Sequence, residues 1–313
     1  MRISISTGNH KNSGSITDTV LFLKAALQDC GHQAEINPGV MPECHNILIE
    51  HFVDVDSVRE VFEARAMGAR YILIGTEPII GGSFNNGIDA SHWHYSNAAY
   101  WQLRFDAFKA VAQVADAIWV LAESMVAGYA ELFPDLPVRF LPHGHVNHFA
   151  TVRQRPEAER DIDFYFSGSL TDHRRRILDT LLQKHSVVVH DQTTPEYLRQ
   201  DQLSRSKVCL SLRLSAHNDI ASVSRLHFHL QNRSFLLHET CALPCPLDPF
   251  VLQAPTADLM TWALAALELP NRRELADSMH DRFRAGLPMT RYLLPLLDEV
   301  LVHPAHSPRA QAA

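Results

Sequence analysis

Residues 161–182 combine a strand, a short turn and a helix, and this unit constrains the fold most strongly. Apolar and polar residues alternate over 162–166, as in a buried strand, and the strand breaks at Ser167-Gly168-Ser169. A helix then begins near Thr171 with three arginines, 174–176, in its first turn. Positive side chains oppose the helix dipole there, so an anionic ligand would explain them. An ordinary strand–helix unit with a solvated basic face is the alternative.

Strands and helices alternate along most of the 313 residues, which are enough for about two domains. The first series covers 1–146, the segment 147–160 loses periodicity and is typical of a linker, and the second series covers 161–303. The strand at 70–75 is almost continuously apolar, as in a parallel sheet covered on both faces. We therefore expect an α/β protein of two Rossmann-like parallel-sheet domains that face a cleft. A C-terminal helix is expected to cross back, and the tail 304–313 to be disordered.

Composition excludes several classes of protein. A net charge of −7 argues against general binding to nucleic acid or to a membrane surface, so any anion site must be local. No apolar run is long enough to span a membrane. Five scattered cysteines fit reduced thiols, and a strand that starts at Arg2 leaves no room for a signal peptide. We expect a cytoplasmic protein.

Four segments, in their order along the chain, resemble the GT-B glycosyltransferases, especially bacterial enzymes with a CgeB-like or group-1-like C-terminal half. They are Asp116–Ser124 before a helix, Val138–His145 before the linker, Asp163–Ser169 with its basic helix, and Arg225–Glu239. The resemblance implies a nucleotide diphosphate sugar, with UDP and GDP both open, in the C-terminal domain and an acceptor in the N-terminal domain. It also implies transfer of the sugar to an acceptor hydroxyl without a metal or another cofactor.

The donor site is expected at the strand ends of the second domain. Ser167, Gly168, Ser169 and Arg174 are candidates for the diphosphate. Arg213 ends a strand and Arg225 starts a helix, so both could make bidentate contacts with the same phosphates.

The sequence departs from the family pattern in one segment. Phe228 stands where group-1-like enzymes often carry a glutamate, and Arg233 stands at their glycine. Glu239, at the end of the following strand, is the replacement candidate for holding the ribose hydroxyls.

Catalytic candidates come from the first domain. His143 and His145 lie where that domain meets the linker, and a neutral imidazole there could act as a general base. Glu77 follows a buried strand and could be a general base or bind the acceptor. The alternatives are buried structural histidines and a loop or helix-capping carboxylate.

The first strand–helix turn supplies the acceptor candidates Gly8, Asn9, Ser13 and Gly14. It matches neither the dinucleotide fingerprint nor a P-loop. Pairs such as His227-x-His229 point apart on a helix, so no metal site is expected. Tyr95 and Trp93, in a loop before a helix, are candidates for stacking on a sugar.

Two other functions stay open. One is a nucleotide-sugar epimerase or hydrolase on the same scaffold. The other is an inactive pseudo-glycosyltransferase that binds a partner protein, suggested by Phe228 and Arg233. Formation of a homo-oligomer is compatible with either.

Overall fold

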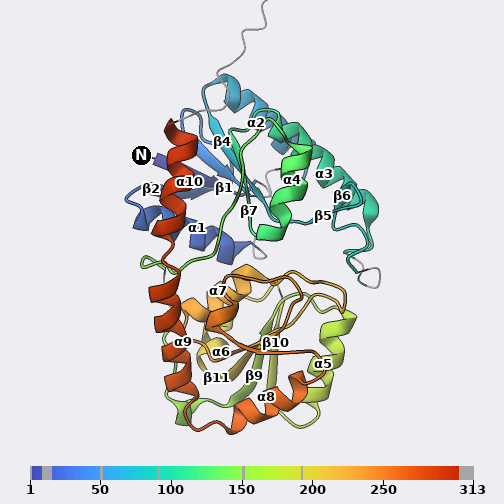
Figure 1. Ribbon diagram of the computed structural model, residues 1–313, viewed down its shortest axis with the longest axis vertical. Helices are drawn as coiled ribbons and strands as arrows, with labels where there is room; N and C mark the ends of the chain where they lie inside the picture. The colour runs from blue at the N-terminus through green and yellow to red at the C-terminus, as the bar shows by residue number, and fades with distance from the viewer. Residues whose placement is uncertain are drawn as a thin grey trace, which may run out of the picture.

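The computed structural model describes residues 2–8, 16–49, 52–89, 92, 94–149, 152–191 and 193–302. Two parallel sheets lie one above the other along the long axis of the molecule, and helices cover both (Figure 1). The expected two-sheet α/β architecture is therefore confirmed.

The first sheet has six strands in the order β2-β1-β3-β4-β7-β8, and every neighbouring pair is parallel. Its strands are β1 (Arg2–Ser6), β2 (Gln33–Asn37), β3 (His45–Leu48), β4 (Arg70–Gly75), β7 (Ala117–Val120) and β8 (Val138–Phe140). Its helices are α1 (Thr17–Asp29), α2 (Val55–Ala66), α3 (Ala98–Ala112) and α4 (Val126–Leu132). Apolar clusters bury both faces of this sheet, with Phe22 of α1 in one and Phe108 of α3 in the other.

A short antiparallel hairpin of β5 (Ile79–Ile80) and β6 (Ser83–Phe84) follows β4. It was not expected, because two-residue strands carry no period that a sequence can show. The hairpin brings Asn85 next to the loop that follows β4, which matters for the site below.

The second sheet has five parallel strands in the order β10-β9-β11-β12-β13. They are β9 (Ile162–Ser167), β10 (Val187–His190), β11 (Ser206–Ser211), β12 (Leu236–Glu239) and β13 (Leu252–Ala254). The helices of this domain are α5 (Asp172–Leu182), α6 (Glu196–Ser204), α7 (Val223–Gln231), α8 (Leu259–Glu268) and α9 (Arg272–Gly286).

The chain crosses between the domains twice, and the two crossings lie side by side. The His145 N–H donates to the Leu287 carbonyl at 2.7 Å, and the Met289 N–H donates to the His145 carbonyl at 2.9 Å. A Cβ on Gly144 would lie 2.7 Å from the Leu287 oxygen, so this close approach needs glycine. The first and second crossings are thus hydrogen-bonded to each other.

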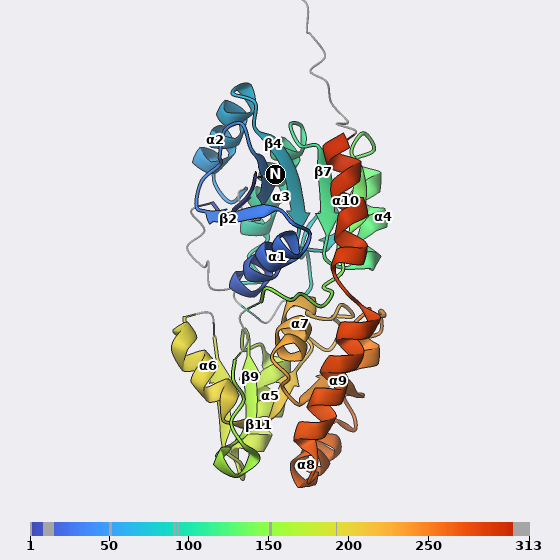
Figure 2. The same ribbon diagram turned by 90° about the vertical axis from the view of Figure 1, so that its left-hand side faces the viewer.

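After the second crossing, α10 (Thr290–Val302) returns to the first domain (Figure 2). It packs near α1, and Arg139 forms an ion pair with Glu299 of α10. The expected crossing back of the C-terminal helix is confirmed. A helix within the sequence range of the second domain therefore helps to bury the first.

Candidate active site in the interdomain cleft

A cavity of about 820 Å³ lies between the two sheets. Residues just after β4, β9, β11 and β12 line it, namely Thr76, Gly168, Leu212 and Cys241, the last of these two positions beyond its strand. Ligands of parallel α/β sheets bind at the carboxyl ends of the strands, and here those ends from both domains meet in one space.

Arg225, in the first turn of α7, is the positive charge best placed for a ligand. Its Nε donates to the Ser167 carbonyl at 2.7 Å, and its guanidinium lies 5.2 Å from the centre of the Phe166 ring. Its Nη1 is buried without a hydrogen-bond partner among the described residues. Burial lowers the pKa of Arg225 to about 10. A buried donor of this kind is costly unless an acceptor arrives, and the cavity is where one can enter.

Gly168 makes room for that guanidinium. Its φ of 141° lies in the region that favours glycine, and an added Cβ would lie 2.3 Å from Nη2 of Arg225. Gly168 was expected to let a ligand approach the backbone closely. In this structure the group that lies against it is the Arg225 side chain.

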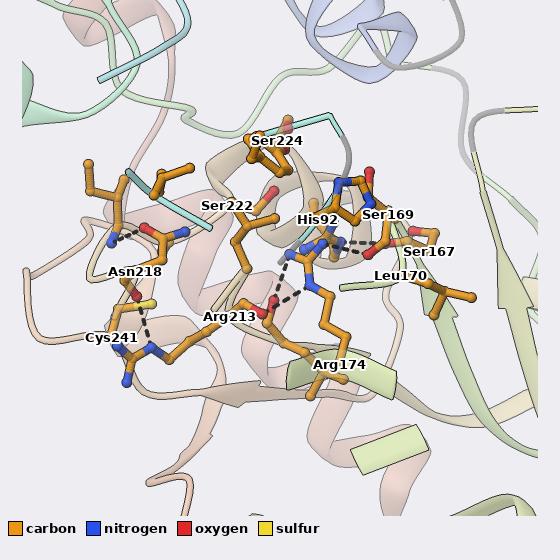
Figure 3. Close-up of a pocket in the computed structure, with 18 of the residues that line it drawn as sticks. His92, Ser167, Ser169, Leu170, Arg174, Arg213, Asn218, Ser222, Ser224 and Cys241 are labelled. Atoms are coloured by element: carbon orange, nitrogen blue, oxygen red, sulfur yellow. Dashed lines mark hydrogen bonds between the residues drawn. The ribbon is translucent and has the colours of Figure 1, made fainter. Parts of the chain in front are cut away.

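The N-terminus of α7 also opens into the cavity. Ser222 is its N-cap residue, and its side chain makes no capping hydrogen bond, while Ser224 lies in the first turn. Figure 3 shows both serines at the cavity. From the sequence, Arg225 was expected to contact the phosphates, but the main anion site was placed on α5, and Ser222 and Ser224 were missed. The pattern Ser222-x-Ser224-Arg225 before an apolar helical stripe is a signal that could have found them.

Arg174 and Arg213 line the cavity but bond to backbone. Arg174 donates at 3.0 Å each to the carbonyls of Ser169, Leu212 and Arg213. Arg213 donates to the Asn218 carbonyl (Figure 3). It also donates to the Ala216 carbonyl and pairs with Asp219. Burial and the nearby Arg225 lower the pKa of Arg174 to about 9. In this structure the two arginines hold the loops that wall the cavity, and their role as phosphate ligands stays a prediction.

Glu239 does not face the cavity. It is completely buried, and its carboxylate accepts hydrogen bonds from His173 at 2.9 and 3.0 Å, from the Arg213 N–H at 2.8 Å and from Thr256 at 2.7 Å. Three donor groups therefore hold this carboxylate inside the domain, and the predicted contact with ribose hydroxyls has no support in this arrangement.

His143 and His145 do not line the cleft cavity either. The His143 ring is buried, stacks on Phe22 at 4.3 Å, and neither of its nitrogens has a hydrogen-bond partner among the described residues. Burial lowers its pKa to about 3. A general base must reach the proton that it removes, so His143 cannot act as one here. His145 lies at a different cavity, on the side of the two crossings.

Glu77 is the one catalytic candidate that the structure brings to the cleft. Asn85 donates to its carboxylate at 2.6 Å, and Arg104 pairs with it at 3.4 Å. Glu77, His92 and Tyr95 also line a second cavity of about 340 Å³ that adjoins the first. Glu77 thus sits where the two cavities meet.

The second cavity is largely aromatic on the side of the first domain. Its walls include His94, Tyr95, Tyr100 and Trp101, and the Tyr95 and Trp101 rings stack with centres 5.8 Å apart. Burial raises the pKa of Tyr95 to about 12, so its hydroxyl stays protonated near neutral pH.

No protein-family model matches this sequence, and a search of curated proteins finds no match. Solved structures do match. An α-glucosyltransferase in complex with UDP and a 13-mer DNA aligns over 96% of this chain and 100% of its own, with 9% identity and a TM-score of 0.57. AviGT4, a glycosyltransferase involved in avilamycin A biosynthesis, aligns over 96% and 98%, with 11% identity and a TM-score of 0.54.

This chain has the GT-B fold. Against TarM it spans 86% of its own length but only 56% of the TarM chain, at 11% identity and a TM-score of 0.49.

In this GT-B fold the acceptor candidates are mostly untested. Gly8 adopts a left-handed conformation with φ of 60° and does not line the two cleft cavities. Asn9, Ser13, Gly14 and Trp93 lie outside the described residues.

The sequence analysis also missed an ion pair across the GT-B cleft. Asp18 of α1 pairs with Arg199 of α6, and both residues line the larger cavity. They lie 181 positions apart, so no local pattern could have joined them.

Metal binding and membrane insertion would need features of the described residues that can be checked directly. Those residues contain no group of three or more histidine, cysteine or acidic side chains placed to hold a metal ion. Within the same residues, no helix is long and apolar enough to cross a membrane.

Proposed function

We propose that this protein is a glycosyltransferase that moves a sugar from a nucleotide diphosphate sugar to an acceptor hydroxyl. One observation carries the proposal: the buried Arg225, with Nη1 lacking a partner, lies beside the α7 N-terminus in the large cavity between the domains. A guanidinium and a helix N-terminus both favour a diphosphate, in the ground state and more strongly as it leaves.

The diphosphate occupies the side of the cavity formed by Ser222, Ser224 and Arg225. In this pose Arg225 donates through Nη1, and the free N–H groups of the first turn of α7 donate beside it. Both sets of donors neutralise negative charge as the sugar–phosphate bond breaks, which is the step that limits departure of the nucleotide.

The acceptor occupies the smaller cavity, with Glu77 at the junction. Its carboxylate can remove the proton of the attacking hydroxyl, and Asn85 and Arg104 fix its orientation. The aromatic walls suit a ring that stacks, and a cavity of about 340 Å³ suits a small acceptor rather than a nucleic acid.

Metal independence and a cytoplasmic location are parts of the same proposal. Five arginines line the larger cavity, Arg174, Arg175, Arg199, Arg213 and Arg225, and their charge can replace that of a divalent cation. All five cysteines are free thiols, as expected in a reducing compartment.

The test is release of nucleotide diphosphate from UDP-, GDP-, ADP- and TDP-sugars, with and without EDTA and with a panel of small hydroxyl acceptors. We expect release from one donor that depends on an acceptor, that survives EDTA, and that Glu77→Gln lowers at least tenfold in kcat. Glu123→Gln, a carboxylate in the turn before α4 that lines neither cavity, is the matched control.

Each other result points to a rival. Equal release without acceptor would favour a hydrolase or an epimerase. Binding without turnover across all donors would favour a pseudo-glycosyltransferase.

A further inference from the structure

A third cavity, of about 570 Å³, lies where the chain crosses between the domains. It shares no lining residue with the two cleft cavities. Its walls come from residues 145–149 and 152–154 of the first crossing, the C-terminal end of α7 and one face of α9. It is therefore a separate site, formed mainly by the second domain and the first crossing.

Cationic side chains dominate this cavity. Four arginines line it, Arg153, Arg233, Arg273 and Arg284, and no carboxylate among the described residues does. The nearby carboxylates, Asp277 and Asp281 of α9, are shared. Asp277 lies 2.9 Å from Arg233 and 2.9 Å from Arg273. Asp281 lies 3.7 Å from both Arg233 and Arg284. Asp29 of α1 is a third carboxylate nearby, and it accepts from the Asn147 N–H at 2.6 Å. Three carboxylates cannot neutralise four guanidinium groups, so the cavity keeps an excess of positive charge.

Two buried histidines form the floor of the cavity. His145 is 8% exposed and His280 is 5% exposed, and their ring centres are 5.3 Å apart. Burial, together with His280 and Arg284, lowers the pKa of His145 to about 4. Burial is the main cause of this shift, and the neighbouring cations add to it.

The backbone is strained to place one of the arginines. Arg233 has a φ of 52°, a left-handed conformation that costs about 1–2 kcal/mol for a residue with a Cβ. A glycine would fit that turn without strain, but a glycine could not supply the guanidinium that lines the cavity. Arg233 directly follows the C-cap of α7, and the Ser234 N–H donates to the His229 carbonyl at 3.0 Å, so the left-handed residue also ends the helix.

The linker side of the cavity is held in place by hydrogen bonds. Asn232 accepts from the Val152 N–H at 2.6 Å, and Gln231 donates to the Val146 carbonyl at 2.6 Å. The His145 backbone in turn bonds to Leu287 and Met289 of the second crossing. The cavity is thus a formed site whose walls touch both connections between the domains.

We propose that this cavity binds a phosphorylated small molecule, at a site distinct from the cleft. Arginine forks match phosphate oxygens in geometry and charge, and the cavity volume admits a sugar phosphate or a diphosphate of similar size.

The test is calorimetric titration with inorganic pyrophosphate at 0.15 M salt. The titrated protein carries Arg225→Gln, which removes the cation proposed to bind phosphate in the cleft. We expect one remaining binding event, weakened at least tenfold when Arg153→Gln and Arg284→Gln are added. The matched control adds Arg2→Gln and Arg59→Gln, two exposed arginines of the first domain, and should bind pyrophosphate as before.

Three outcomes would overturn the proposal: no binding to the Arg225→Gln protein, equal binding after loss of Arg153 and Arg284, or an equal loss in the control pair. If Arg225→Gln does not fold, the same titration is made on the protein that keeps Arg225. It should bind two pyrophosphates, and its Arg153→Gln/Arg284→Gln form only one; an unchanged number of sites contradicts the proposal.

Discussion

Asp18 of the first domain and Arg199 of the second form an ion pair that joins the two walls of the cleft. The Arg199 guanidinium also lies 4.2 Å from the centre of the Phe228 ring, so this aromatic side chain helps to position the arginine. Burial raises the pKa of Asp18. The contact is largely shielded from water, because the two side chains are 22% and 16% exposed.

We predict that this pair stabilises the folded protein by holding the two domains together. In a double-mutant cycle of Asp18→Asn and Arg199→Gln, followed by urea unfolding, the coupling energy should exceed about 1 kcal/mol, within the range for partners in contact. Additive effects of the two substitutions would show that the pair contributes nothing to stability.

A second prediction concerns acid stability and His143. The folded pKa is about 3 and the unfolded pKa 6.5, so the unfolded chain binds a proton that the folded chain refuses as pH falls below 6.5. This histidine leaves the free energy of unfolding unchanged above pH 6.5. Below that pH it lowers the free energy of unfolding progressively, by about 2 kcal/mol at pH 5.

Replacing His143 by phenylalanine should remove that loss. Phenylalanine keeps the stack on Phe22, and neither imidazole nitrogen has a hydrogen bond to lose. The free energy of unfolding, measured in urea at pH 7.5 and pH 5, should fall less for His143→Phe than for the native protein. The exposed His217→Gln should behave like the native protein, and an equal pH dependence in all three would count against a neutral buried His143.

A third prediction concerns Glu239 as a structural carboxylate. Glu239→Ala would leave His173, the Arg213 N–H and Thr256 without their acceptor, and should destabilise the protein by about 3 kcal/mol or more. Thr256→Val removes only one of these donors and should cost about 1 kcal/mol. The contradicting result is a Glu239→Ala variant that unfolds at the same urea concentration as the native protein but no longer binds nucleotide. The carboxylate would then belong to the ligand site.

The elements of the fold were predictable from local periodicity, whereas the directions of the long side chains were not. Strand β4 is marked by an apolar run, β9 by alternation of apolar and polar residues, and the α7 stripe by its 3.6-residue period. An arginine in a first helical turn, such as Arg174, can point to an anion or fold back onto carbonyls. Which of the two occurs depends on Ser169 and Leu212, which belong to separate loops.

The hydrogen-bond partners of Glu239 could not be predicted from local periodicity either. The sequence places it at a strand end, which is correct. It does not show that donors from α5, the end of β11 and the segment after β13 converge on one carboxylate, because those elements meet only in the folded sheet.

A fourth prediction concerns the left-handed residue Arg233. Arg233→Gly relieves the backbone strain at φ of 52° but loses the ion pair with Asp277, whereas Arg233→Ala loses the pair and keeps the strain. The glycine variant should therefore be about 1 kcal/mol more stable than the alanine variant in urea unfolding. Equal stability would mean that the turn tolerates a side chain without strain.

The most direct test of the cleft as a nucleotide site is calorimetric titration of UDP, GDP, ADP and TDP into the native protein and into Arg225→Gln. We predict that one nucleotide diphosphate binds the native protein. Arg225→Gln should weaken that binding at least tenfold, as expected for one lost charge-assisted hydrogen bond of about 1.5–3 kcal/mol. The exposed Arg59→Gln should leave it unchanged. Absence of binding by any of the four, or equal affinity in Arg225→Gln, would contradict the account.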